Sequence, residues 1–321
     1  MAIDSQNRNL STLTGEAFPL LAVRAWREWH HVGMPNAPLA PTVRRRRLGG
    51  ALRRLRNEAG LSLDRAASAM SWQSPKMSKI ENAVQAIRPA DLDKLLTIYG
   101  VGDPEVRDTL EQLRNDAAKK GWWQAYSQVV GPLYADYISL ETDAEMVCSW
   151  SPLLIPGLFQ SAAYARETIA GITTTRSADE VTALAEVRMA RQSVLSRPGA
   201  PLEFWAIIHE AALRLRFASR PGIMREQLRR LRDTAELPNV TVQLMPLDAT
   251  AHPGLEGAFS LTKFRAPLPS VVLLENPGGA TYVEGEDAVP FERAYERIRA
   301  TALPVEDSLV RIAELEEGFR K

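Results

Sequence analysis

Cysteine and histidine are scarce in this 321-residue sequence, which has one cysteine, Cys148, and four histidines. A single cysteine cannot form an intramolecular disulfide bond or a cysteine-rich zinc site. Four histidines leave little for a histidine-based metal centre, so we expect neither a metal nor another cofactor. No segment approaches the roughly 18 apolar residues of a membrane-spanning helix, and the apolar run at 17–23 lacks the basic flank of a signal peptide. These absences predict a cytoplasmic protein.

The formal net charge is zero, because 39 basic residues balance 39 acidic ones. The balance hides an asymmetry: residues 44–88 hold eleven Arg or Lys against three acids, whereas residues 121–321 hold 20 against 26. A basic segment attracts polyanions such as nucleic acid, and an acidic segment does not. The same surplus would also arise from a solvated basic helix face.

The length predicts about two domains, and the hydrophobic share of 45% is ordinary for globular protein. Residues 1–40 lack sustained apolar periodicity and contain several prolines, so we interpret them as a leader. Met34 begins a segment that would suit a translation start, which leaves the start open between Met1 and Met34. We expect a basic domain at 41–120 and a second domain at 121–321.

The apolar pattern of the basic domain predicts five short helices. Gly60 suits the end of the first helix, Ser62 suits the cap of the second, and Pro75 suits the first turn of the third. The expected helices run through residues 48–59, 62–70, 74–81, 89–99 and 103–117.

Two short helices joined by a three- or four-residue turn form a helix-turn-helix. The run from Leu61 to Ala67, the turn after it, and the run from Met77 to Asn82 resemble the Xre and phage-repressor family of helix-turn-helix proteins. The resemblance covers about residues 44–100. The sequence departs from the family at Ser71 and Ala83, where the family has glycine. A non-glycine residue adopts the left-handed conformation at a cost of about 1 kcal/mol.

The resemblance implies that the third helix enters the major groove of DNA with its N-terminal residues at the base edges. The residues at those positions are Gln73, Ser74, Lys76 and Lys79. Lysine can donate to guanine, although a solvated lysine would fit the same pattern. The basic run would contact phosphates, form a minor-groove arm or be a plain basic tail; it consists of Arg44, Arg45, Arg46 and Arg47. Arg56 and Glu81 match positions that form a structural ion pair in the family.

The second domain alternates helical and strand patterns, which predicts an α+β fold with about five strands. The expected helices cover residues 137–150, 161–170, 178–196, 209–217, 221–236, 287–302 and 306–319. The expected strands cover residues 202–208, 240–245, 257–264, 270–275 and 280–284.

Several motifs of this domain resemble the C-terminal domain of WhiJ-like regulators. They include Trp122-Trp123, the segment from Trp150 to Gln160, and the segment from Glu186 to Gln192. The function of that domain is uncharacterised. The resemblance implies a regulator of development or secondary metabolism, with a small partner protein encoded nearby.

Catalytic motifs are missing from the second domain, because no nucleophile motif, Walker loop or dinucleotide fingerprint is present. Glu141 and Glu145, four residues apart, are more typical of a solvated helix face than of a carboxylate pair. We therefore expect no enzyme activity and no catalytic residue. Candidate residues for a ligand or partner site are Trp122, Trp123, Arg188, Arg191 and His252, although aromatic cores and ion pairs would use the same residue types.

Together these patterns predict a sequence-specific DNA-binding transcriptional regulator. Its second domain would sense a small effector or bind a partner protein, and would hold the contacts of a homodimer, because basic helix-turn-helix domains repel each other. Two alternatives stay open. One is an antitoxin-like protein whose second domain captures a small partner, and the other is a DNA-targeted enzyme with an unrecognised active site.

Overall fold

The computed structural model describes residues 42–117, 119, 121–173, 175–218, 220–276 and 279–319. The predicted leader lies outside the described residues. The helical region and the sheet region pack into one compact unit, Pro41–Lys321. No helix within the described ranges is both long and apolar enough to cross a membrane.

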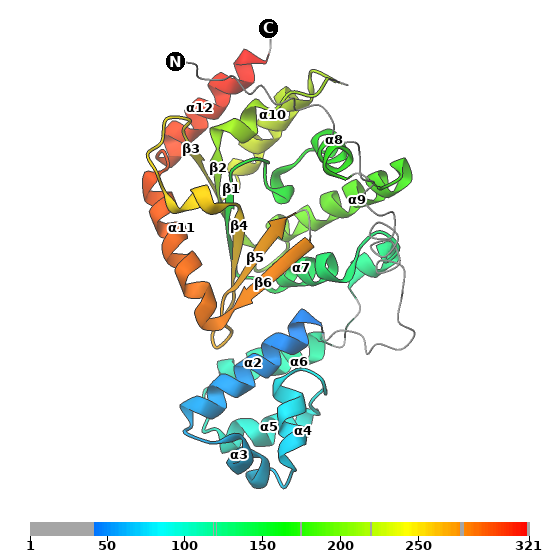
Figure 1. The fold of residues 1–321 in the computed structure, drawn as a ribbon, viewed down its shortest axis with the longest axis vertical. Helices are drawn as coiled ribbons and strands as arrows, with labels where there is room; N and C mark the ends of the chain where they lie inside the picture. Colours follow the sequence, from blue (N-terminus) through cyan, green and yellow to red (C-terminus); the bar gives the residue numbers. More distant parts are fainter. Residues whose placement is uncertain are drawn as a thin grey trace, which may run out of the picture. The chain divides into compact units, whose positions relative to one another are not determined.

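Five helices form the N-terminal region, as the apolar pattern predicts (Figure 1). They are α2 (Val43–Glu58), α3 (Leu63–Ala69), α4 (Ser74–Glu81), α5 (Pro89–Ile98) and α6 (Pro104–Asp116). The Ser62 hydroxyl accepts a hydrogen bond from the Arg65 amide and so caps α3. Helix α2 begins five residues before the expected start, because Thr42 caps it and Val43 is fully buried.

Ser71 and Ala83 occupy the left-handed region, with φ of 58° and 63°. These are the two positions at which the sequence departs from the glycines of the Xre family. The turn geometry is therefore kept without glycine, at the steric cost expected for side chains in this region.

A six-stranded mixed sheet forms the second region, with strand order β3-β2-β1-β4-β5-β6. The strands are β1 (Met146–Ser151), β2 (Glu203–His209), β3 (Val240–Met245), β4 (Phe259–Lys263), β5 (Val271–Asn276) and β6 (Gly279–Glu284). Strands β1, β2 and β3 are parallel, and β4 pairs antiparallel with β1 and β5. The expected α+β class is correct.

The prediction of a helix through 137–150 is wrong in its second half. Helix α7 (Pro132–Asp143) ends before Ala144, and residues 146–151 form β1 at the centre of the sheet. Residues 147–150 are buried, so this strand lacks the alternation of a half-exposed one. A short strand buried on both faces cannot be distinguished from a buried helix by periodicity.

Five further α-helices complete the described second region: α8 (Ala162–Ile172), α9 (Ala178–Arg191), α10 (Ile223–Ala235), α11 (Val289–Thr301) and α12 (Val305–Gly318). Two expected helices are partly or wholly 3₁₀ turns. Residues Gln192–Ser196 continue α9 as a 3₁₀ helix, and Glu210–Arg214 form one after β2.

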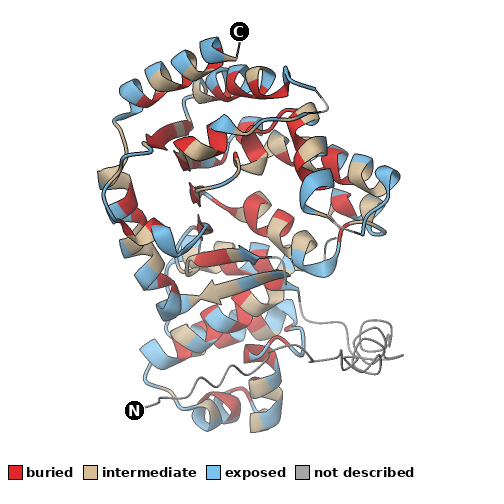
Figure 2. Cartoon of the chain, turned by 45° about the horizontal axis from the view of Figure 1, so that its top comes forward, coloured by how far each residue is buried: buried red, intermediate tan, exposed pale blue. Residues whose placement is uncertain are grey.

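Each face of the sheet has its own hydrophobic core, and Figure 2 shows the buried residues on the strands and on the inner faces of the helices. Phe204, Ala206 and Ile208 of β2 pack in one cluster with residues of α10 and α12. Ile207 of the same strand packs in another cluster with Tyr295 of α11. The sheet is thus covered on both sides, as its partly parallel topology requires.

Candidate nucleic-acid interface

Helices α3 and α4 form the helix-turn-helix pair, and one hydrogen bond joins their starts. The Ser74 hydroxyl donates to the Asp64 carboxylate. Met77 and Ile80 of α4 are buried against the other helices, whereas Gln73 and Lys79 are exposed. The N-cap and the last turn of α4 therefore present polar side chains to solvent, while its apolar side holds it in the domain.

Lys76 and Lys79 differ in how they are held. The Lys76 ammonium lies 3.7 Å from the centroid of the Trp72 ring and 3.9 Å from the Asp91 carboxylate. Lys79 is exposed and forms no ion pair with any other residue that the structure describes. Cation–π contact restricts Lys76, so the two lysines are unequal candidates for base contact. No local pattern in the sequence indicates Trp72 and Asp91 as its neighbours.

Glu81 at the end of α4 is the point where α2 holds the recognition helix. Arg56 binds it through two hydrogen bonds, from Nε to Oε1 at 2.7 Å and from Nη2 to Oε2 at 3.1 Å. The hydrogen bonding with Glu81 raises the pKa of Arg56. The structure thus places Arg56 and Glu81 in contact, as the resemblance implied. Arg53, which the sequence analysis missed, adds a bond to Glu81 Oε2 at 3.3 Å and another to Asn82.

Gly49 brings the backbone of α2 against the end of α4. A Cβ atom at this position would lie 2.4 Å from the Glu81 carbonyl oxygen and 2.9 Å from the Ile80 carbonyl oxygen. Real Cβ atoms do not approach backbone this closely, so only glycine fits. The two helices are therefore joined by both a charged pair and direct backbone contact.

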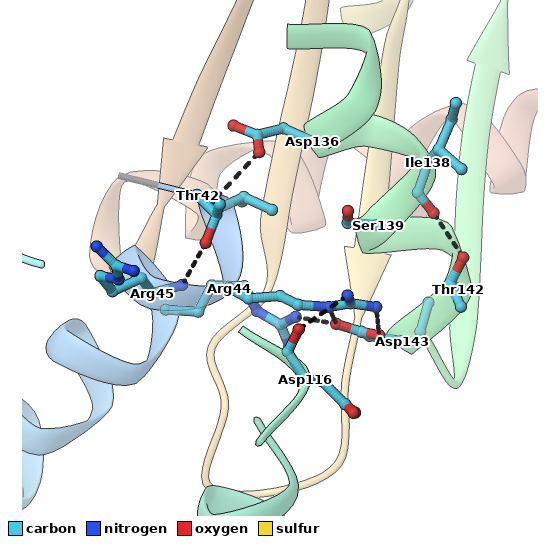
Figure 3. A network of polar contacts seen from close by, with 12 residues as sticks. Thr42, Arg44, Arg45, Asp116, Asp136, Ile138, Ser139, Thr142 and Asp143 are labelled. Carbon is cyan, nitrogen blue, oxygen red and sulfur yellow. Dashed lines mark hydrogen bonds and ion pairs between the residues drawn. The ribbon is translucent and has the colours of Figure 1, made fainter. Parts of the chain in front are cut away.

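The basic run at the start of α2 lies against the second domain (Figure 3). Arg44 donates to both carboxylate oxygens of Asp143, at 2.8 and 2.7 Å. Arg46 pairs with Asp136 at 3.1 Å. Arg47 is 1% exposed and lies 3.4 Å from Asp143.

This placement corrects the expectation of a free basic arm. In this arrangement Arg44 and Arg47 cannot reach a DNA phosphate, because both are buried. Arg45 is half-buried and lines a cavity of about 110 Å³ with Leu48, Ile80 and Arg114. Nothing in the sequence pointed to Asp136 and Asp143 as partners, since they lie about 90 residues further along the chain.

Arg191, a candidate ligand residue, is a buried structural residue. Its guanidinium donates to the Glu141 carboxylate at 2.8 and 2.5 Å and to the Tyr134 hydroxyl at 2.7 Å. Glu141 is 1% exposed. The pair joins α9 to α7, so neither residue is free to bind a ligand, and Glu141 is not on a solvated face.

Arg188 belongs to a set of side chains that hold the loop at 155–160. It donates to the Gln160 amide oxygen at 2.8 Å. Gln192 donates to the carbonyls of Gly157 and Gln160, and Gln227 donates to that of Phe159. Arg188, Gln192 and Gln227 therefore fix the backbone geometry of this loop.

The remaining candidates do not converge on one site. Trp123 is buried in a cluster with Ile138 and Val187, while Trp122 beside it is 42% exposed. His252 lies with Trp150 on the sheet face that α11 covers, 5.2 Å between ring centroids. Its Nδ1 accepts from the Gly254 amide, and burial lowers its pKa.

A surface hollow of about 480 Å³ is lined in part by Pro253, the residue after His252. Its lining residues are Pro253, Glu286, Val289, Pro290, Arg293, Ala294 and Arg297. Arg293 and Arg297 are exposed on α11, one helical turn apart, and neither forms an ion pair with a described residue. Among the described side chains, no three of His, Cys, Asp or Glu group so as to hold a metal ion.

Comparison with known families gives two matches along the chain. Residues 47–117 match a helix-turn-helix domain family, which indicates DNA binding. Residues 134–314, more than half of the chain, match a family described as a domain of unknown function, DUF5753. No curated protein and no solved structure matches the chain.

Proposed function

Because the chain belongs to the DUF5753 family and carries a helix-turn-helix domain, we propose that it is a sequence-specific transcriptional regulator of the WhiJ-like, Xre type. The polar, partly exposed side of α4 carries this proposal. Gln73, just before the helix, and Lys79, in its last turn, are exposed, Ser74 and Lys76 are half-buried, and Met77 and Ile80 are buried.

In this function α4 lies in the major groove, with the side chains between Gln73 and Lys79 meeting the bases and the DNA backbone. Lys79 has free donors for guanine O6 and N7, whereas Trp72 and Asp91 orient Lys76. Gln73 precedes the helix and has no capping hydrogen bond, so its side chain is free to meet a phosphate beside the first amides of α4.

The test is selection of genomic DNA fragments by the purified full-length protein, followed by binding curves on the selected site. Lys79→Ala should lose about 1–3 kcal/mol of specific binding if Lys79 reads a base. Arg220→Ala, which also removes one exposed positive charge but from the sheet region, is the control and should bind like wild type. Absence of any selected sequence would refute the proposal.

The sheet region, in this proposal, supplies regulatory input and dimer contacts without catalytic turnover. The hollow beside His252 supports an effector role, because its lining combines two arginines without ion-pair partners among the described residues with four apolar residues and one acid, Glu286. Such a lining suits a small anion with an apolar part.

A thermal-shift screen with short-chain carboxylates and phosphate esters tests the effector role. Binding should raise the melting temperature of wild type and not that of Arg293→Gln/Arg297→Gln. Arg299→Gln is the control, because Arg299 pairs with Glu296 on the same helix. A shift only on adding a partner protein would favour the antitoxin-like alternative, and turnover of a probe would favour the enzyme.

A further inference from the structure

Helix α2 contributes to two hydrophobic cores. Val43, at its start, is fully buried in the cluster of the sheet region, with Leu140 of α7 and Val147 of β1. Leu52 and Leu55, further along the same helix, are buried in the cluster of the five-helix region. An α-helix of 16 residues is a rod of about 24 Å. A displacement at one end of α2 is therefore carried to the other.

We propose that Asp143, in the sheet region, is a positioning residue for the DNA-reading helix α4 and acts on it through α2. This inference rests on the proposed function, since it assumes that α4 reads DNA. It makes the sheet region part of the recognition apparatus.

The Asp143 carboxylate binds the start of α2 through ion pairs. It accepts two bonds from Arg44 and also pairs with Arg47, so one carboxylate serves two buried guanidiniums. Arg47 lies with its guanidinium 3.4 Å from the centroid of Phe264, and its Nε and Nη2 have no hydrogen-bond partner among the described residues. Burial lowers the pKa of Arg47 to about 10. Removing the Asp143 charge would leave both arginines without their main counter-charge.

Asp136 makes a second, weaker set of contacts with the first turn of α2. Its carboxylate accepts from the Val43 amide at 3.1 Å and from Arg46 at 3.1 Å. Leu268, in the loop between β4 and β5, packs against both hydrophobic cores. The start of α2 is thus fixed from α7 and from the β4–β5 loop.

Helix α2 is in direct contact with α4 just beyond the residues that Asp143 binds. Gly49 lies against the Glu81 and Ile80 carbonyls, and Arg53 and Arg56 hold the Glu81 carboxylate. Gly49 is two residues beyond Arg47, so less than one helical turn separates the Asp143 contact from the α4 contact. A ligand or partner that moves α7 would therefore shift the orientation of α4.

The experiment compares full-length wild type with Asp143→Asn. The control is Glu145→Gln, two residues away, which removes an exposed pair with Arg265. Without DNA, hydrogen exchange at residues 74–82 should rise in Asp143→Asn and stay unchanged in Glu145→Gln. On the selected DNA site, Asp143→Asn should bind about tenfold more weakly, with an unchanged salt slope because no phosphate contact is lost. Asp143→Glu should recover part of the affinity.

Unchanged exchange at 74–82 together with wild-type affinity in Asp143→Asn would overturn the inference. If that variant does not fold, Asp136→Asn decides by the same two measurements, because Asp136 holds the same turn with a more exposed pair. A wild-type protein that selects no DNA refutes the proposed function. The exchange measurement still tests the coupling of Asp143 to α4.

Discussion

At the residue scale, the orientation of α4 depends on a few buried charges whose partners lie far away in the sequence. Glu81 is 4% exposed and is held by Arg56 and Arg53, 25 and 28 residues before it. Arg44, Arg47 and Asp143 form a similar group at the other end of α2. Buried charges need such partners, because an unpaired charge in the interior is strongly destabilising.

Substitution of Arg56 tests this dependence. Arg56→Ala should lower the free energy of unfolding by about 2–3 kcal/mol, since Glu81 would stay buried with only the longer bond from Arg53. Urea denaturation of the full-length protein measures the change. Arg54→Ala is the matched control, because Arg54 pairs with the exposed Glu58 on the same helix and should cost less than about 1 kcal/mol. Equal stability of the two variants would contradict the role of the pair.

At the element scale, α2 connects α4 to the sheet region. Its start is buried with α7 and its middle is in backbone contact with α4. The two consecutive glycines in α2 show how uneven its surroundings are. Gly49 is packed against α4, whereas nothing lies within 4 Å of a Cβ atom at Gly50.

The two glycines should respond to alanine in opposite directions. Gly50→Ala should stabilise the protein by about 0.5–1 kcal/mol, because alanine is the better helix former at an open position. Gly49→Ala should destabilise it and displace α4, because the new Cβ meets the Glu81 carbonyl. Thermal unfolding of the two variants beside wild type measures both effects. A stabilised Gly49→Ala would show that α2 and α4 are not in contact.

At the scale of the whole described unit, α2 is packed in the hydrophobic cores of both the helix-turn-helix region and the sheet region. The two regions are therefore joined by packing and not only by a linker. The basic surplus of residues 44–88 is partly used in this junction, because Arg44, Arg46 and Arg47 face acidic residues of the sheet region. Part of the charge asymmetry between the two regions therefore holds them together. In the proposed function, a ligand or partner bound to the sheet region would regulate DNA binding by moving α2.

Local sequence determined the presence of the five helices of the helix-turn-helix region and the Ser62 cap of α3, because these depend on neighbours within a few residues. It also pointed to the Arg56–Glu81 pair through a family resemblance. Only the tertiary structure decided that 146–151 is a central strand, since burial on both faces removes the periodic signal. Only the tertiary structure decided that Arg44 and Arg47 meet Asp143, because pairing across about 100 residues depends on how α7 packs on α2 and leaves no local pattern.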